Sequence, residues 1–273
     1  RMQVNQQELA VRTQGSGPLF VWGHGLTSSM RSDDVLGIFA WEKFPEDICL
    51  LRYDARGHGQ SAPADSPAGY HWAELGRDMT ALAQSHAGSK GYVLGGQSMG
   101  CATSLYAALQ CPAQVRGLVL VNPPTAWQTR AAQGAFYRKT AWISGLLGGR
   151  LLGKVMSKDL ARVLPWWLLE ARGGQMLNAL EGLQAMGRKT LFNLFRGAAL
   201  TDLPAESALA SLQMPTLILA WSDDPTHPLQ TAETLSKILP QAQLHIAHNN
   251  QDVLLWPGLI REFVSQCSAD STG

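Results

Sequence analysis

Short apolar runs alternate with amphipathic helical patterns along most of this chain. Continuous apolar runs bounded by turn residues are typical of strands buried on both faces of a sheet. Such runs predict strands at 19–22, 48–53, 92–94, 115–121, 216–221 and 243–247, and a weaker alternation predicts one at 8–12. Apolar residues at helical spacing predict helices at 72–86, 101–110, 228–239 and 253–266. This order favours an α/β fold with a doubly wound, mainly parallel sheet.

Residues 126–205 interrupt the alternation. They are rich in Leu, Trp, Gly and basic residues, are helical in character and contain no convincing strand. We therefore predict a core formed by residues 1–125 and 206–273 and a helical lid inserted at 126–205. An insertion at this point belongs over the C-terminal edge of the strands, where such sheets bind ligands. The length of 273 residues suits one large domain of this kind.

A glycine-rich turn joins one predicted strand to the next helix. Gly96-Gln97-Ser98-Met99-Gly100 fits G-x-S-x-G, a sharp strand-to-helix turn that exposes a serine hydroxyl at the top of a sheet. The flanking glycines have a steric reason, because a Cβ there would clash with a neighbouring strand or helix. An ordinary glycine-rich loop is the alternative, but the flanking strand and helix are those that the motif requires.

The overall composition excludes several kinds of protein. The 22 basic residues nearly balance the 21 acidic ones, which argues against a polyanionic partner such as nucleic acid. The four cysteines are widely spaced and form no CxxC pair, a pattern typical of reduced thiols that favours a cytoplasmic location. No apolar run is long enough to span a bilayer.

Four motifs of this chain resemble motifs of the α/β-hydrolases and occur in the same order along the sequence as in that family. The resemblance covers nearly the whole chain. The motifs are the Gly96–Gly100 turn, His24-Gly25, the YDARGHGQS segment at 53–61, and the WSDDPTHP segment at 221–228. The resemblance implies an eight-stranded, mainly parallel sheet with a helical lid. It also implies a serine-nucleophile enzyme similar to esterases and lipases.

By this resemblance Ser98 is the nucleophile. A serine hydroxyl is a weak nucleophile, so it needs a base within hydrogen-bonding reach and an acid that orients the base. The oxyanion of the tetrahedral intermediate needs two donors, which would be the backbone N–H groups of Met99 and Leu26. His24 is expected to support its loop rather than transfer protons.

The resemblance places the acid just after the strand at 216–221. Asp224 stands four residues before Pro228, which matches the family pattern D-x-x-x-P. Asp223 is the neighbouring alternative. Either aspartate could instead cap the helix that follows Pro228.

The expected position of the base does not hold a histidine. Counting back from Pro257 places it at Asn250, and asparagine cannot accept a proton at neutral pH. Three explanations stay open. His248 serves from two residues upstream, His227 reaches in from the loop that carries the acid, or the triad is incomplete through natural divergence or deliberate substitution.

Tryptophans and basic residues of the lid bear on the substrate. Trp127, Trp142 and Trp166 stand among many leucines and are candidates for an apolar substrate pocket over Ser98. The alternative is that they dock the lid on the core. Basic residues in the first half of the lid suit a carboxylate or an acyl carrier, or are simply solvated helix faces.

These features predict a serine hydrolase that cleaves an ester, thioester or lactone with an apolar acyl part through an acyl-enzyme on Ser98. A C–C bond hydrolase or a perhydrolase on the same core is an alternative. So is a catalytically weak ligand-binding protein, because of Asn250. The expected partner is a small apolar ester-like substrate, and the expected state a monomer or dimer. No cofactor is implied, and no metal, because the histidines lack ligand spacing.

Overall fold

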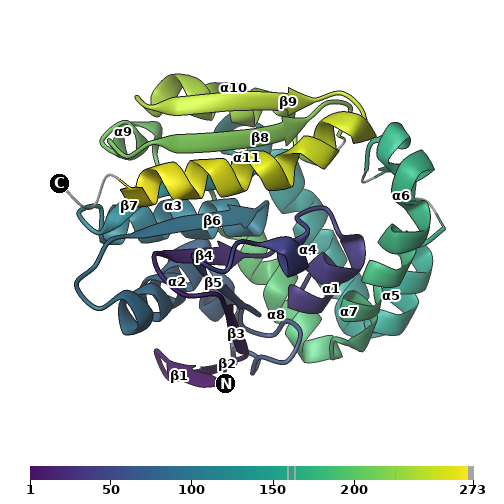
Figure 1. Cartoon of the computed structure of the whole chain (residues 1–273). Helices are drawn as coiled ribbons and strands as arrows, with labels where there is room; N and C mark the ends of the chain where they lie inside the picture. The colour runs from purple at the N-terminus through teal and green to yellow at the C-terminus, as the bar shows by residue number, and fades with distance from the viewer. Residues whose placement is uncertain (159, 163, 225, 270–273) are drawn as a thin grey trace.

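A seven-stranded sheet forms the centre of the molecule (Figure 1). The computed structural model describes residues 1–158, 160–162, 164–224 and 226–269. The strand order is β3-β5-β4-β6-β7-β8-β9; β3 pairs antiparallel with β5 and the other neighbouring strands pair in parallel. The strands are β3 Val11–Gln14, β4 Leu19–Gly23, β5 Cys49–Tyr53, β6 Tyr92–Gln97, β7 Val115–Val121, β8 Thr216–Trp221 and β9 Ala242–Ala247.

The start of the chain differs from the predicted sheet. The resemblance implied eight strands, but β1 (Met2–Val4) and β2 (Gln7–Leu9) pair with each other in a separate two-stranded sheet. The two residues between them, Asn5 and Gln6, both have positive φ, as the tightest hairpin turns require. The single strand predicted at 8–12 is therefore wrong, because β2 ends at Leu9 and β3 begins at Val11.

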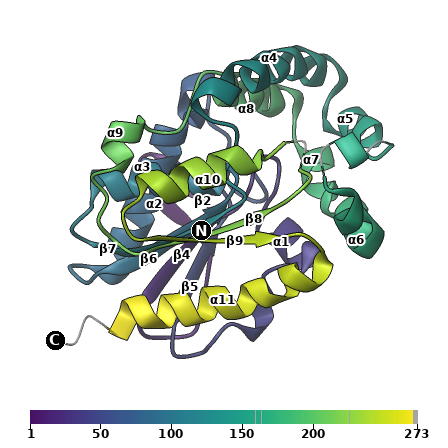
Figure 2. The same ribbon diagram turned by 90° about the horizontal axis from the view of Figure 1, so that it is seen from above.

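Helices cover both faces of the sheet (Figure 2). On one side lie α2 (Trp72–Ala87), α3 (Met99–Gln110) and α10 (Leu229–Ile238), and on the other lie α1 (Met30–Leu36) and α11 (Asn250–Ala269). Successive strand residues face opposite sides, so each strand contributes to two cores. In β4, Val21 packs in the cluster with α2 and α3, whereas Phe20 and Trp22 pack in the cluster with α11. The predicted doubly wound α/β fold is confirmed.

The segment between β7 and β8 is helical in its described part. Figure 1 shows several of its helices on the side toward which the parallel strands point. A separate apolar cluster, including Leu152, Leu183 and Leu194, packs these helices together. The helices are α4 Arg130–Leu147, α5 Gly149–Met156, α6 Trp166–Ala179, α7 Glu181–Ala185, α8 Arg188–Ala199 and α9 Glu206–Leu209.

Short 3-10 helices complete the secondary structure at Trp41–Lys43, Pro67–Tyr70, Trp127–Thr129 and Leu160–Arg162. None of the helices in the described part of the chain combines the length and the apolar character needed to cross a bilayer.

Candidate active site

Ser98 occupies the sharp turn between β6 and α3. Its φ of 53° and ψ of −108° place it in a backbone conformation that few residues other than glycine adopt. The turn is possible because its flanking residues lack side chains. A Cβ on Gly96 would lie 2.6 Å from the Gly100 Cα, and one on Gly100 would lie 2.0 Å from the Gly23 carbonyl oxygen. The hydrogen bond from the Ser98 amide to the Val121 carbonyl, 2.9 Å long, fixes the turn to β7.

His227 is the histidine that lies beside this serine. Its Nε2 is 2.9 Å from the Ser98 Oγ, and its Nδ1 is 2.8 Å from the Asp224 Oδ2. The His227 side chain keeps 19 % of its surface exposed, so it lies at the border between core and solvent. These distances fit an imidazole that donates its Nδ1 proton to Asp224 and accepts the Ser98 hydroxyl proton at Nε2.

Asp224 is held by several donors from its own loop. Oδ1 accepts from the backbone amides of Thr226 and His227, at 2.7 and 2.9 Å, and from the Thr226 hydroxyl at 2.8 Å. Oδ2 accepts from the Trp221 indole as well as from His227. Burial raises the pKa of Asp224, but the charge of His227 and these hydrogen bonds outweigh it and lower the pKa to about 2.

The alternative acid and the alternative base lie elsewhere. Asp223 is exposed, and its carboxylate accepts from the Ser222 hydroxyl at 2.8 Å. His248 is also exposed, and its backbone amide donates to Asp252 at 2.8 Å. Of the two candidate histidines, the structure brings His227 to Ser98 and leaves His248 at the surface.

Asn250, in the expected histidine position, has a different set of contacts. Its Oδ1 accepts from the Arg172 Nε at 2.9 Å, and the same guanidinium donates to the Leu36 carbonyl at 3.0 Å. Arg172 stands at a kink in α6, where its φ is −138°. Asn250 therefore connects the start of α11 with α6.

Two backbone segments adjoin Ser98 and bear the predicted oxyanion donors. Met99 is the first residue of α3, so its amide has no acceptor within the helix. The loop after β4 approaches from the other side, because a Cβ on Gly25 would be 3.7 Å from the Ser98 Cβ. Leu26 follows Gly25 in this loop.

Two buried histidines support the loop that carries Leu26. The His24 Nε2 accepts from the Ala55 amide at 3.0 Å, and the His58 Nε2 accepts from the Thr27 amide at 3.3 Å. Burial, together with the charge of His24, lowers the pKa of His58 to about 3, so it stays neutral. His58 was not among the residues predicted for the site, because only the fold reveals that it contacts Thr27, the residue after Leu26.

The three tryptophans predicted to line a pocket lie in different surroundings. Trp127 packs against the core, and its indole donates to the Pro204 carbonyl at 3.1 Å. Trp142 and Trp166 are 68 % and 66 % exposed, contrary to the expectation of a buried lining. In α4 the reason is geometric, because the buried side of the helix presents small residues such as Ala141 and Ser144 while Trp142 points outward.

The motifs and the geometry agree with a comparison to known families. The family described as serine aminopeptidase, S33, matches residues 24–251. The chain belongs to this family of α/β-hydrolases. It is accordingly a hydrolase, as the sequence predicted.

Relatives of this α/β-hydrolase carry names for several hydrolytic reactions. The chain is 29 % identical to the proposed carbamate hydrolase RutD of Pseudomonas savastanoi pv. phaseolicola, over 83 % of each chain. It is 33 % identical to 2-(acetamidomethylene)succinate hydrolase of Mesorhizobium japonicum, over 45 % of this chain and 41 % of that one.

Solved α/β-hydrolases share the fold at low sequence identity. A thermophilic esterase from Thermogutta terrifontis superimposes with a TM-score of 0.81 at 18 % identity, covering 96 % of this chain and 94 % of the other. The enol-lactonase of Burkholderia xenovorans superimposes with a TM-score of 0.75 at 17 % identity, covering 97 % and 98 %. At these identities the likeness concerns the fold alone.

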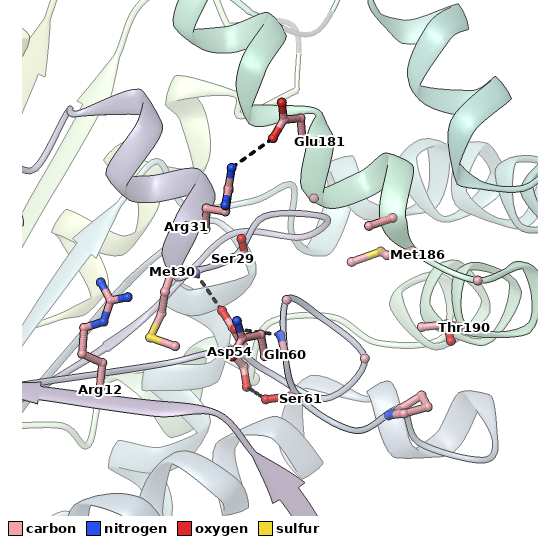
Figure 3. A pocket seen from close by; sticks show the side chains of 16 residues that line it. Arg12, Ser29, Met30, Arg31, Asp54, Gln60, Ser61, Glu181, Met186 and Thr190 are labelled. Carbon is pink, nitrogen blue, oxygen red and sulfur yellow. Dashed lines mark hydrogen bonds and ion pairs between the residues drawn. The ribbon is translucent and has the colours of Figure 1, made fainter. Parts of the chain in front are cut away.

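A cavity of about 420 Å³ lies between the α/β-hydrolase core and α7 (Figure 3). Core residues such as Ser29 and Asp54 form one wall, and Met186 and Thr190 belong to the other. The Asp54 carboxylate that faces it accepts from the amides of Met30 and Gln60, so it is already satisfied. Ser98 does not line this cavity. Across the described ranges, no group of three or more His, Cys, Asp or Glu side chains is arranged to hold a metal ion.

Proposed function

We propose that this protein is a serine hydrolase that cleaves an ester, thioester or lactone through an acyl-enzyme on Ser98. One observation carries the proposal. The His227 imidazole is hydrogen-bonded on one side to the Ser98 hydroxyl, at 2.9 Å, and on the other to the buried Asp224 carboxylate, at 2.8 Å. This is the constellation that turns a serine hydroxyl into a nucleophile.

The first half-reaction forms the acyl-enzyme. The Ser98 Oγ attacks the carbonyl carbon while its proton passes to the His227 Nε2. Asp224, with its lowered pKa, stays ionised and stabilises the imidazolium. The amides of Met99 and Leu26 donate to the oxyanion, an interaction that typically contributes about 10²–10³ in rate per donor. His227 then gives its proton to the leaving group, and the bond between the carbonyl carbon and that group breaks.

The second half-reaction repeats these steps with water. His227 removes a proton from water, the resulting hydroxide attacks the acyl carbon, and the proton returns to Ser98 as the acid is released. The alternative of a catalytically weak binding protein depends on Asn250. The contact between His227 and Ser98 argues for an activated serine without a histidine at position 250.

Two features support an acyl substrate that reaches Ser98 beneath a lid. The inserted helices of 126–205 lie toward the C-terminal ends of the strands, the edge that holds Ser98. Leu26, which follows the Gly25 that adjoins Ser98, packs against the apolar clusters of both the core and the inserted helices. An apolar acyl part suits these surroundings. The relatives' names add carbamates and N-acyl compounds to the classes worth testing.

A fluorophosphonate probe tests the proposal. Rapid labelling of the intact protein that disappears in Ser98→Ala is the expected result, because the probe reacts with activated serines. Ser104→Ala is the matched control, since this buried serine lies in α3, outside the turn. An intact protein that is not labelled would contradict the proposal. A panel of short p-nitrophenyl esters, a thioester, a lactone and an aryl carbamate then ranks the substrate classes by kcat/KM.

A further inference from the structure

The outward side of α4 and α5 is apolar where a surface helix is normally polar. On α4, Phe136, Trp142 and Leu146 are 55 %, 68 % and 73 % exposed. On α5, Leu151 and Val155 are 44 % and 56 % exposed. Surface helices of globular proteins turn such residues inward, so a group of exposed ones marks an interaction surface.

These residues lie on one side of each helix. At 100° per residue, positions 136, 142, 143 and 146 fall within half of the α4 circumference, opposite the buried Gly134, Ala141 and Ser144. Leu151 and Val155, four residues apart, share one side of α5, opposite the buried Gly149 and Gly153. Figure 2 shows α4 and α5 at the outer rim of the molecule.

The same two helices carry only positive charge. Residues 127–158 contain no Asp or Glu, although the whole chain has 21 acidic residues. Exposed cations accompany the apolar positions, and Arg150, Lys154 and Lys158 recur every four residues. The exposed cations of this segment are Arg138, Lys139, Arg150, Lys154 and Lys158. Among the described residues, none of these five cations forms an ion pair.

We propose that this surface, the α4–α5 face, docks the protein on an anionic lipid bilayer. The face consists of Phe136, Trp142, Ile143, Leu146, Leu151 and Val155 with the five cations named above. Helices that lie in a membrane interface combine Trp, Phe and Leu on one side with Lys and Arg around them. The apolar side chains enter the boundary between headgroups and acyl chains, and the cations meet the lipid phosphates. This inference is independent of the chemistry proposed for Ser98.

The charge of the α4–α5 face favours an anionic bilayer as its binding partner. A second copy of the chain would bring the same five cations against each other, since a twofold interface pairs a surface with itself. A neutral apolar partner would leave these cations without counter-charges. A bilayer with anionic headgroups satisfies the apolar and the charged positions together.

Vesicle flotation tests the proposal with vesicles of phosphatidylglycerol and phosphatidylcholine against vesicles of phosphatidylcholine alone. We expect the full chain to float with the anionic vesicles and to be released by high salt. Lys154→Glu/Lys158→Glu should weaken binding at least about tenfold, because each basic residue near the surface contributes about 1 kcal/mol. Lys90→Glu/Lys237→Glu makes the same charge change at exposed positions outside the face and should bind as the wild type does.

The apolar side chains have their own pair of variants. Leu146→Asn/Val155→Asn should also weaken binding to the anionic vesicles, whereas Leu254→Asn/Leu255→Asn on the exposed side of α11 should not. Circular dichroism and turnover of a soluble ester verify that each variant is folded. The proposal would be overturned if the protein did not float, or if it bound both kinds of vesicle equally. It would also be overturned if each control variant lost as much binding as the matching variant of the α4–α5 face. A concentration-dependent dimer that Leu146→Asn/Val155→Asn converts to monomers would overturn it as well, because a second copy would then cover the face.

Discussion

The Arg172 Nε donates a hydrogen bond of 2.9 Å to the Asn250 Oδ1 and so connects the kink of α6 to the first turn of α11. The same guanidinium reaches the Leu36 carbonyl at the end of α1. Arg172, from the inserted helices, is thus hydrogen-bonded to both α1 and α11, the two helices on one face of the sheet. Asn250, at the position where the α/β-hydrolase pattern expects a histidine, therefore connects two helices in this chain.

Asn250→His should therefore give no gain in esterase activity. His227 already lies within hydrogen-bonding distance of Ser98. The substitution would also remove the Asn250 oxygen that accepts the hydrogen bond from Arg172. We expect the free energy of unfolding to fall by about 1–2 kcal/mol, as for the loss of a hydrogen bond to a charged group. Urea unfolding and ester turnover measure the two effects, with Gln251→His at an exposed neighbouring position as the control. An activity rise of orders of magnitude would mean that the triad of the wild type is incomplete.

Asp224→Asn should lower kcat sharply while Asp223→Asn should not. The Asp224 carboxylate accepts the Nδ1 proton of His227, and an amide in its place favours the wrong tautomer of the imidazole. The analogous change in serine proteases costs about 10⁴ in kcat, so we expect a loss on the order of 10³–10⁴. Asp223 is exposed and faces the Ser222 hydroxyl. Steady-state kinetics on one ester compares the two variants, and similar activities would remove Asp224 from the mechanism.

The buried His58 should make the protein less stable in acid. Its pKa is about 3 in the folded state and near 6.5 when exposed, so below pH 6.5 the unfolded chain takes up a proton that the folded chain refuses. Stability from this group is present above pH 6.5 and is lost as the pH falls toward 3. Linkage gives a loss of about 2 kcal/mol between pH 7 and 5.

His58→Gln should flatten this pH dependence, although it lowers stability at pH 7 by disturbing the bonds to Thr27 and Arg56. Asp33 acts in the opposite sense, because burial raises its pKa to about 6 and the folded state then binds the extra proton. Asp33 is present in both proteins, so the difference between their unfolding curves from pH 7 to 5 isolates His58. The same substitution at the exposed His248 is the control. Parallel curves for the wild type and His58→Gln would contradict the assignment.

The strand pattern was predictable because buried parallel strands are continuous apolar runs with turn residues at their ends. Val115–Val121 and Thr216–Trp221 were predicted to the residue for this reason. The first strands were not, since their short alternating segments depend on a turn at Asn5 and Gln6 that the pattern does not reveal. The turn at Ser98 was predictable from sterics, because a side chain on either flanking glycine meets backbone.

The base could not be chosen from the sequence because two histidines stood in suitable loops. The deciding feature is the short loop after β8, in which Asp224 accepts from the amides of Thr226 and His227 and thereby turns the histidine toward the serine. The orientation of Trp142 was equally hidden. Helical spacing shows that α4 has two sides, but only packing shows that the side with small residues faces the core.

Gly100→Ala should destabilise the protein severely. The added Cβ would lie 2.0 Å from the Gly23 carbonyl oxygen and 2.6 Å from its carbon, and neither backbone atom can move without shifting β4. We expect a loss of roughly 3 kcal/mol or more in the free energy of unfolding. Gly258→Ala in α11 is the control, because no atom lies within 4 Å of its Cβ position and alanine favours a helix by about 0.5–1 kcal/mol. Thermal unfolding separates the two, and equal stabilities would contradict the packing described for the turn.

The most direct test of the account measures kcat/KM of His227→Ala and His248→Ala on the same short p-nitrophenyl ester. Each variant removes one imidazole, but only His227 lies 2.9 Å from the Ser98 hydroxyl, whereas His248 is exposed. We predict that His227→Ala loses activity by about 10³-fold or more, as for the removal of a triad base, and that His248→Ala keeps the wild-type value. Full activity in His227→Ala, or a comparable loss in His248→Ala, would contradict the assignment of His227 as the base that activates Ser98.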